Sequence, residues 1–176
     1  MSGHNKWSKI KHRKAATDAK KSKVFGKISR LLSSEAKRVR GDVNAPGLRA
    51  AIEKAREANM PTENIQRAIE KGKTDISEGL ETVLYEAYGP NGVAIVISGI
   101  TDNRNRTGSE IKRVLAAHGS SLAEPGAALW AFEKKGGVFK AKTNILLSSE
   151  DKEKLAAVKN TLSDHDDVQE IYTNEL

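Results

Sequence analysis

The spacing of apolar residues changes near Gly79, and this change constrains the fold more than any other feature of the sequence. Before Gly79 the apolar residues recur every three or four positions, as on one face of a helix. After Gly79 the β-branched and alternating runs that are typical of strands appear, with helical stretches between them. With 176 residues, 38% of them hydrophobic and 30% charged, the chain is long enough to bury a core. We therefore expect an α+β protein.

The first part contains three apolar stripes at helical spacing. They run from Val24 to Val39, ending near Gly41, from Leu48 to Ala55 after Pro46-Gly47, and from Ile65 to Ile69 between Pro61 and Gly72. The stripes are wide enough to bury against one another. We expect a basic arm over residues 1–21 and a small three-helix domain over residues 22–78.

The second part alternates strand and helix patterns. The expected elements are strands Thr82–Tyr88 and Val93–Gly99 around the turn Gly89-Pro90-Asn91-Gly92, a helix around Ile111–His118 that ends at Gly119, strands Ala128–Lys134 and Val138–Thr143, a helix capped by Ser148, and a final strand Val168–Thr173. Counted from Val93, this is the β-α-β-β-α-β order of the ferredoxin-like plan, with one extra N-terminal strand. We expect this domain over residues 79–176, with two helices on one face of an antiparallel sheet.

The basic residues are concentrated at the start of the chain. Residues 1–40 contain 13 Lys or Arg against Asp18 and Glu35, a net charge of +11, whereas the whole chain carries +7. Such a block predicts a polyanion-binding arm; a solubilising tail or a targeting peptide are the alternatives. Residues 6–14 lack the apolar stretch of a secretory signal, and a mitochondrial presequence is the minor interpretation because lysine outnumbers arginine.

Nucleic acid is the polyanion that this block fits best. Lysines suit phosphate contacts, and Trp7 lies among them as a ring that either stacks on an unpaired base or anchors the arm to the helical domain. The predicted contact residues are Lys6, Trp7, Lys9, Lys11, His12, Arg13, Lys14, Lys20, Lys21, Lys23, Lys27 and Arg30.

Arg104 and Arg106 form a second basic cluster, in the turn before the helix around Ile111. Two arginines at a helix N-terminus oppose the macrodipole, and a bound phosphate would relieve that cost, so both are predicted as further nucleic-acid contacts. In the alternative, Asp102 caps the helix and the arginines pair with surface acids.

The reactive groups that an enzyme needs are sparse. The chain has no cysteine, and its four histidines lie in the arm, at a helix end where His118 is expected to contact the last carbonyls, and in an acidic turn. That turn, Asp164-His165-Asp166-Asp167, matches no common metal-ligand spacing and is expected to be solvated. We expect no catalytic residue, no cofactor and no metal. No apolar run approaches the length of a membrane span.

Five motifs, in order through nearly the whole chain, closely resemble the YebC/PmpR family. They are the segments 2–14, 18–21, 58–61, 88–94 and 101–107. The family includes bacterial proteins described as probable transcriptional regulators, the mitochondrial translational activator of cytochrome c oxidase, and ribosome-associated factors that help translation through proline runs. The resemblance implies a helical first domain with a basic arm, an α+β second domain, no catalytic activity and a nucleic-acid partner.

The sequence differs from the family in one place. Most members carry a third domain, and here the resemblance implies that it is missing near residues 136–143, where a short hairpin is expected instead. Hairpin tips tolerate such changes, so the second domain should still fold.

Two functions follow from the resemblance and the charge pattern. The first is a DNA-binding transcriptional regulator; the alternative is a ribosome-associated translation factor that binds large-subunit rRNA and relieves stalling at proline-rich stretches. Asn64, Gln66 and Arg67 in the third helix give weak support to base reading in DNA, whereas an extended lysine-rich arm suits an irregular RNA backbone. Both stay open at this point, for a chain expected to be cytoplasmic and monomeric.

Overall fold

The structure is a computed structural model that describes residues 4–74 and 79–176, with side chains from residue 14 onward. The chain divides into two compact units, Met1–Ser77 (unit 1) and Glu78–Leu176 (unit 2). Unit 1 is helical in its described residues, and unit 2 combines a sheet with helices. The expected α+β class, with a helical region followed by an antiparallel sheet domain, is confirmed.

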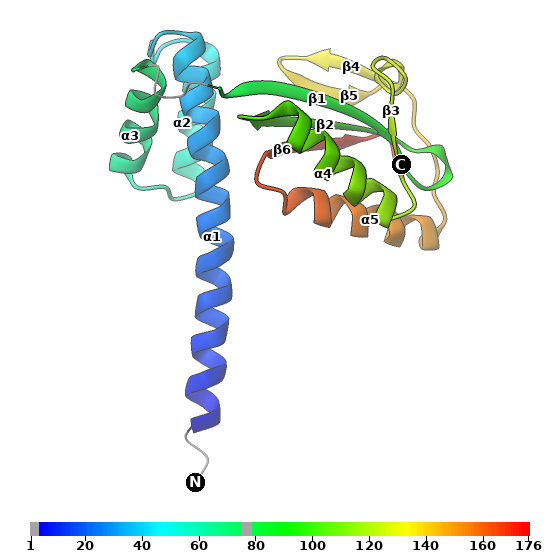
Figure 1. Ribbon diagram of the computed structural model, residues 1–176, viewed down its shortest axis with the longest axis horizontal. Coiled ribbons are helices and arrows are strands. Elements are labelled where there is room, and N and C mark those ends of the chain that lie inside the picture. The colour runs from blue at the N-terminus through cyan, green and yellow to red at the C-terminus, as the bar shows by residue number, and fades with distance from the viewer. Residues whose placement is uncertain (1–3, 75–78) are drawn as a thin grey trace. The chain divides into compact units, whose positions relative to one another are not determined.

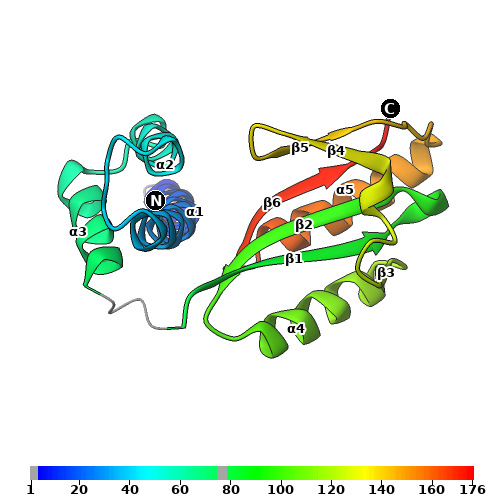
Figure 2. The same cartoon turned by 90° about the horizontal axis from the view of Figure 1, so that it is seen from above.

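Unit 1 contains helices α1 (His4–Arg38), α2 (Pro46–Glu57) and α3 (Thr62–Lys73). The C-terminal half of α1 packs against both α2 and α3, as Figures 1 and 2 show. The core is built from the three apolar stripes of the sequence: Ile28, Leu32, Ala36, Leu48, Ala51, Ala55, Met60, Ile65, Ala68 and Ile69 are all buried. The expected three-helix packing is confirmed for this part of the chain.

The structure corrects the extended arm that the sequence analysis expected. Residues 4–21 belong to α1, so the basic segment is helical. No Gly or Pro interrupts the chain between Gly3 and Gly26, and lysine, arginine and alanine are good helix formers. The helix was missed because it has no apolar face here: every residue from Lys14 to Val24 is exposed, and Figure 1 shows this half of α1 extending beyond α2 and α3.

Unit 2 is built on a four-stranded antiparallel sheet with the order β3-β1-β2-β6. Its strands are β1 (Glu81–Tyr88), β2 (Ala94–Thr101), β3 (Ser121–Ala123) and β6 (Val168–Thr173), and the short helix η1 (Pro90–Gly92) joins β1 to β2. Helices α4 (Arg104–Ala117) and α5 (Ser149–Ser163) cover one face. The short helix η2 (Leu129–Ala131) and the hairpin β4 (Phe132–Lys135) and β5 (Val138–Ala141) cover the other (Figure 1).

Strand β2 is the centre of the unit because it is buried on both faces. Ile95 and Ile97 lie in the cluster with α4 and α5, whereas Ala94 and Val96 lie in the cluster with Phe132 and the β4–β5 hairpin. This explains why β2 is a continuous apolar run rather than an alternating one.

One detail of the expected topology is wrong. In a ferredoxin-like plan, Ala128–Lys134 and Val138–Thr143 would join the main sheet, but β4 and β5 form a separate two-stranded sheet. Strand β2 has β6 on one side, and the other side is occupied by β1, which precedes β2 through the tight turn at η1; sequential strands joined by such turns usually pair. The start of the expected Ala128–Lys134 strand is the η2 turn.

The helix ends follow the expected signals. Gly41 (φ 78°) and Gly119 (φ 67°) adopt the left-handed conformation just after α1 and α4, and Asp151 N donates to the Ser148 side chain at the start of α5 (3.1 Å). Within the described residues, α1 has the length of a membrane span, but no helix combines such length with enough apolar character to cross a bilayer.

Candidate nucleic-acid interface

The described part of α1 carries a line of cations on one side. Lys20, Lys23, Lys27 and Arg30 follow one another at spacings of three and four residues, so they lie along a single face of the helix. Lys37, which was not among the predicted contacts, extends this line. From Lys20 to Lys37 the line measures about 26 Å at the rise of an α-helix. We call these five residues the α1 cation line.

The cation line faces away from the core. Ile28, Leu32 and Ala36 recur every four residues on the opposite side of α1 and are buried. Lys14 and Lys21 belong to the side that becomes buried farther along the helix, but both are exposed because they precede the core. Lys21 Nζ lies 5.5 Å from the centre of the Phe25 ring. Before the core begins, α1 therefore offers cations on opposite sides.

Six predicted contacts lie outside the described side chains. Their backbone belongs to α1, and they are Lys6, Trp7, Lys9, Lys11, His12 and Arg13.

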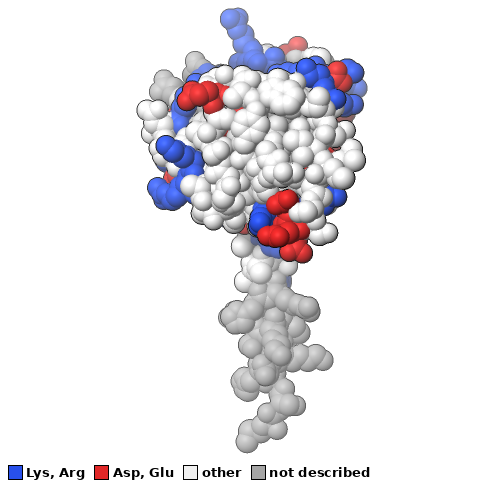
Figure 3. Space-filling model, turned by 90° about the vertical axis from the view of Figure 1, so that its right-hand side faces the viewer, with Lys and Arg blue, Asp and Glu red and all other residues white. Residues whose placement is uncertain are grey.

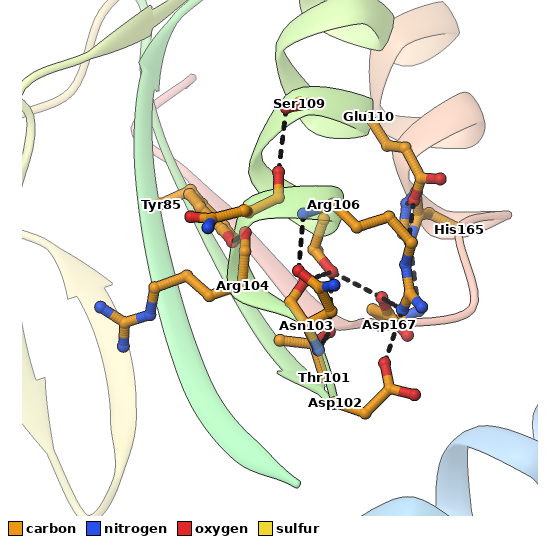
Figure 4. A network of polar contacts seen from close by, with 12 residues as sticks. Tyr85, Thr101, Asp102, Asn103, Arg104, Arg106, Ser109, Glu110, His165 and Asp167 are labelled. Atoms are coloured by element: carbon orange, nitrogen blue, oxygen red, sulfur yellow. Dashed lines mark hydrogen bonds and ion pairs between the residues drawn. The ribbon is translucent and has the colours of Figure 1, made fainter. Parts of the chain in front are cut away.

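The turn before α4 contains a polar network around Asp167 (Figure 4). The Asp167 side chain is only 3% exposed, and its Oδ2 accepts hydrogen bonds from Arg106 Nη2 (2.8 Å) and Thr107 Oγ1 (2.6 Å). Arg106 also lies 2.9 Å from Asp102 Oδ1 and 3.9 Å from Glu110 Oε2. The hydrogen bond to Asp167 and then its charge raise the pKa of Arg106. Arg106 is thus held by acids, as in the alternative considered from the sequence.

Arg104 differs from Arg106 in its surroundings. Figure 4 shows its side chain pointing away from the Asp167 network. Its Nη2 lies 3.3 Å from Glu81 Oε2, and both side chains are largely exposed. The helix cap is Asn103 rather than Asp102, because Asn103 Oδ1 accepts the backbone N–H of Arg106 (3.0 Å).

The acidic turn before β6 is only partly the solvated turn that the sequence analysis expected, because Asp164 and Asp166 are exposed but His165 and Asp167 are not. Asp167 is buried, and its backbone N–H donates to His165 Nδ1 (3.1 Å), while His165 Nε2 lies 2.9 Å from Glu110 Oε2. Glu110, His165 and Asp167 bring ligand-type atoms within 4.8 Å of one another. These groups already bind each other and Arg106, whose charge opposes a cation, so the cluster is explained by its own contacts.

The sequence analysis expected the His118 ring to contact the last carbonyls of α4. Instead, its Nε2 lies 3.0 Å from Thr161 Oγ1 and links α4 to α5. In the third helix, Gln66 and Arg67 are exposed and Asn64 is half-buried.

Two family profiles match the chain in consecutive segments. The profile of the TACO1/YebC protein N-terminal domain matches residues 5–75, and that of the TACO1/YebC second and third domain matches residues 80–144. Among curated relatives, a protein of Dictyoglomus turgidum is 51% identical over 82% of this chain, and one of Pseudothermotoga lettingae is 55% identical over 77% of it. Both bear the name "Probable transcriptional regulatory protein". The chain spans only 59% and 54% of their lengths.

A solved structure has the same fold. The crystal structure of a conserved hypothetical protein from Aquifex aeolicus superposes with a TM-score of 0.82 at 28% sequence identity, covering 90% of this chain and 91% of that one. That protein is described as hypothetical, with no stated function, so this likeness supports the architecture.

Proposed function

Because the chain belongs to the TACO1/YebC family, the YebC/PmpR family of the sequence prediction, we propose that it is a non-enzymatic regulator of gene expression that binds nucleic acid along α1. The α1 cation line is the observation that carries this proposal. A straight row of Lys20, Lys23, Lys27, Arg30 and Lys37, opposite the buried face, suits the regularly spaced phosphates of a polynucleotide. The lysines and arginine of residues 6–14 add to the same helix.

DNA is the first candidate target, as a transcriptional regulator would require, and the names of the relatives support it. The major groove of B-DNA is wide enough for an α-helix, and cations on opposite sides of α1 would reach the phosphates of both strands. Base readers would have to come from elsewhere: the exposed stretch Lys14–Val24 contains no Asn, Gln or Arg. Gln66 and Arg67, which are exposed on α3, suit this role.

Ribosomal RNA is the second candidate, in a translation factor that relieves stalling at proline-rich stretches. The same lack of base readers in Lys14–Val24 favours it, because folded RNA is recognised largely through its shape and its backbone. On either target, no catalytic residue or cofactor is proposed. His118 and His165 each bridge two elements, which supports a structural role for both.

A charge-neutralising variant tests the α1 contact. In K20Q/K23Q/K27Q the affinity for duplex DNA and for ribosomal RNA fragments should fall, and the slope of log affinity against log salt should drop by about 2 to 3. The matched control, K112Q/R113Q/K152Q, removes three exposed positive charges from α4 and α5 and should keep the wild-type slope. Equal slopes for both variants would exclude α1 as the contact surface.

Crosslinking in cells separates the two targets. Bound RNA and bound DNA are sequenced from cells that carry the tagged wild-type chain or the α1 variant. Crosslinks focused on large-subunit rRNA and lost in the variant would identify a translation factor, whereas promoter DNA peaks lost in the variant would identify a transcriptional regulator. Diffuse signal that does not depend on α1 would contradict both.

A further inference from the structure

An exposed tryptophan in unit 2 is held in a fixed orientation. Trp130, in η2, is 55% exposed, yet its Nε1–H donates to Tyr88 Oη (3.1 Å), and Tyr88 Oη in turn donates to the carbonyl of Ala127. The indole N–H is therefore used for positioning, while more than half of the side-chain surface stays open to solvent. Exposed aromatic rings that are pre-ordered in this way lose little conformational entropy when they bind.

A buried carboxylate fixes the segment that carries this ring. Glu86, on β1 and 5% exposed, accepts hydrogen bonds from the backbone N–H groups of Gly126, Ala128 and Leu129 at 2.6 to 2.8 Å. Charge-assisted bonds of this kind are stronger than neutral ones. The contacts from Glu86 and Tyr88 hold the residues before Trp130 on the face of the sheet opposite α4 and α5.

Two exposed lysines lie at the end of β5, which is hydrogen-bonded to the residue after Trp130. Lys142 N donates to the carbonyl of Ala131, the residue after Trp130 (2.8 Å), and Lys140 lies two positions earlier on β5. Ala141 between them packs into the core, so both lysines point outward and are exposed. No ion pair of either lysine occurs within the described part of the chain. By contrast, Lys135 pairs with Glu133 and Lys134 lies over the Phe139 ring.

The sequence around η2 is poor in charge. Figure 3 shows one face of the molecule on which Lys, Arg, Asp and Glu lie mainly along the edge. From Val114 to Phe132 the sequence contains one charged residue, the exposed Glu124. An exposed aromatic ring on a segment with few charged residues, with two lysines at the end of the strand that is hydrogen-bonded to the residue after it, suits the binding of a base by stacking and of its phosphates by charge.

We propose that Trp130 stacks on an unpaired nucleobase of single-stranded nucleic acid while Lys140 and Lys142 contact the adjoining phosphates. This inference rests on the proposed function and adds a second contact, in unit 2, that recognises unpaired nucleotides. Stacking on Trp130 tolerates any base, because every base has a flat π face. The chain would then bind phosphates along α1 and unpaired bases at Trp130.

Fluorescence tests the stacking directly, because the chain has only two tryptophans. In a W7F variant, which keeps an aromatic ring at this predicted contact position, all tryptophan emission comes from Trp130; affinity itself is measured in the wild-type chain. Saturation with short oligouridylate or oligothymidylate should quench this emission, and an abasic oligonucleotide of equal length, which has the phosphates but no bases, should not. Comparing oligouridylate with oligothymidylate distinguishes RNA from DNA, and a fully paired duplex should quench weakly.

Binding is followed in parallel by the anisotropy of a labelled oligonucleotide, which separates the two proposals. Binding without quenching would overturn the stacking proposal and leave the proposed function intact. Absence of binding to these oligonucleotides would also overturn the stacking proposal, whereas the proposed function fails only if duplex DNA and ribosomal RNA fragments are not bound either. A blue shift of Trp130 emission with protein concentration alone would identify an interface between copies and would also overturn it. W130L should weaken oligothymidylate binding at least about fivefold, while W130F should retain most of the affinity. Unchanged affinity in W130L would contradict the inference.

Discussion

At the scale of single residues, Arg104 and Arg106 show how two neighbours of the same type acquire different roles. Both stand at the start of α4, but Arg106 binds the buried Asp167, whereas Arg104 makes an exposed ion pair with Glu81. An exposed pair contributes about 0 to 1 kcal/mol and can exchange its partner for a phosphate. A buried carboxylate that loses its cation is far more costly.

We predict that R106Q lowers the free energy of unfolding by about 2 to 3 kcal/mol without weakening nucleic-acid binding, because Asp167 loses its charged donor. R104Q should leave stability within about 0.5 kcal/mol of wild type. If Arg104 contacts a phosphate, it should also lower the salt slope by about 0.7 to 0.9. Urea unfolding and anisotropy titrations measure both effects. Loss of affinity in a fully folded R106Q would assign Arg106 to the ligand instead.

Tyr172 on β6 gives a prediction for alkaline pH. Burial, and then the charge of Glu170, raises the pKa of its hydroxyl. The folded state therefore keeps this proton after the unfolded chain has lost it, so stability is complete below the ordinary tyrosine pKa of about 10 and falls as the pH rises above it. Tyr172→Phe removes the titrating group, so its unfolding free energy should fall less between pH 9 and about 11 than that of wild type. Urea unfolding at each pH gives both free energies, and an equal fall in wild type and variant over this range would contradict the prediction.

At the scale of elements, two helical glycines separate packing from helix propensity. A Cβ added at Gly72 on α3 would lie 2.4 Å from the Ser33 carbonyl oxygen and 2.8 Å from Ala36 Cβ on α1, whereas nothing lies within 4 Å of one added at Gly26. Gly72→Ala should therefore push α1 from α3, disturb the buried bond from Ser33 Oγ to Ala68 O, and lower stability by about 1 to 3 kcal/mol. Gly26→Ala, the matched control, should raise stability by about 0.5 to 1 kcal/mol. Thermal unfolding followed by circular dichroism measures the stability of both variants. An equal change in stability for the two would refute the close contact at Gly72.

Most elements could be predicted from the sequence because apolar spacing is a local signal. The helices α2 and α3, the β1–β2 hairpin, the cap at Ser148 and strand β6 all follow from it. Helix α1 was only half predicted, since Lys14–Val24 is helical without an apolar face. The separate β4–β5 sheet was missed because strand patterns identify strands but not their partners.

The candidate sites were less predictable, because long-range contacts determine them. The basic residues of α1 were visible as composition, but their alignment in one line depends on the helix continuing through them. Arg106 is held by Asp167, 61 residues away, a partner that no local pattern indicates. Trp130 was taken as part of a strand, and its support by Glu86 and Tyr88 bridges more than 40 residues of sequence.

At the scale of the whole molecule, the two proposed contacts lie in different units. The α1 cation line belongs to unit 1 and the Trp130 site to unit 2. Each unit has its own buried clusters, with no residue shared between them. The charge is divided as well, because the excess of basic residues is confined to the first 40. A single polynucleotide that engaged both units would gain from their linkage as well as from each contact.

The separate cores lead to a prediction about cooperativity. Leu48 is fully buried in the core of unit 1, and Leu48→Ala should destabilise that unit by about 2 to 5 kcal/mol through the lost contacts and the cavity. Because each unit has a core cluster of its own, the slowest-exchanging amides of β2 should keep their wild-type protection in hydrogen exchange while those of α1 and α3 lose theirs. The Trp130 quenching by oligothymidylate should persist in the same variant. Equal loss of protection in β2 would instead show that the units fold as one, and binding at Trp130 would then depend on the integrity of α1.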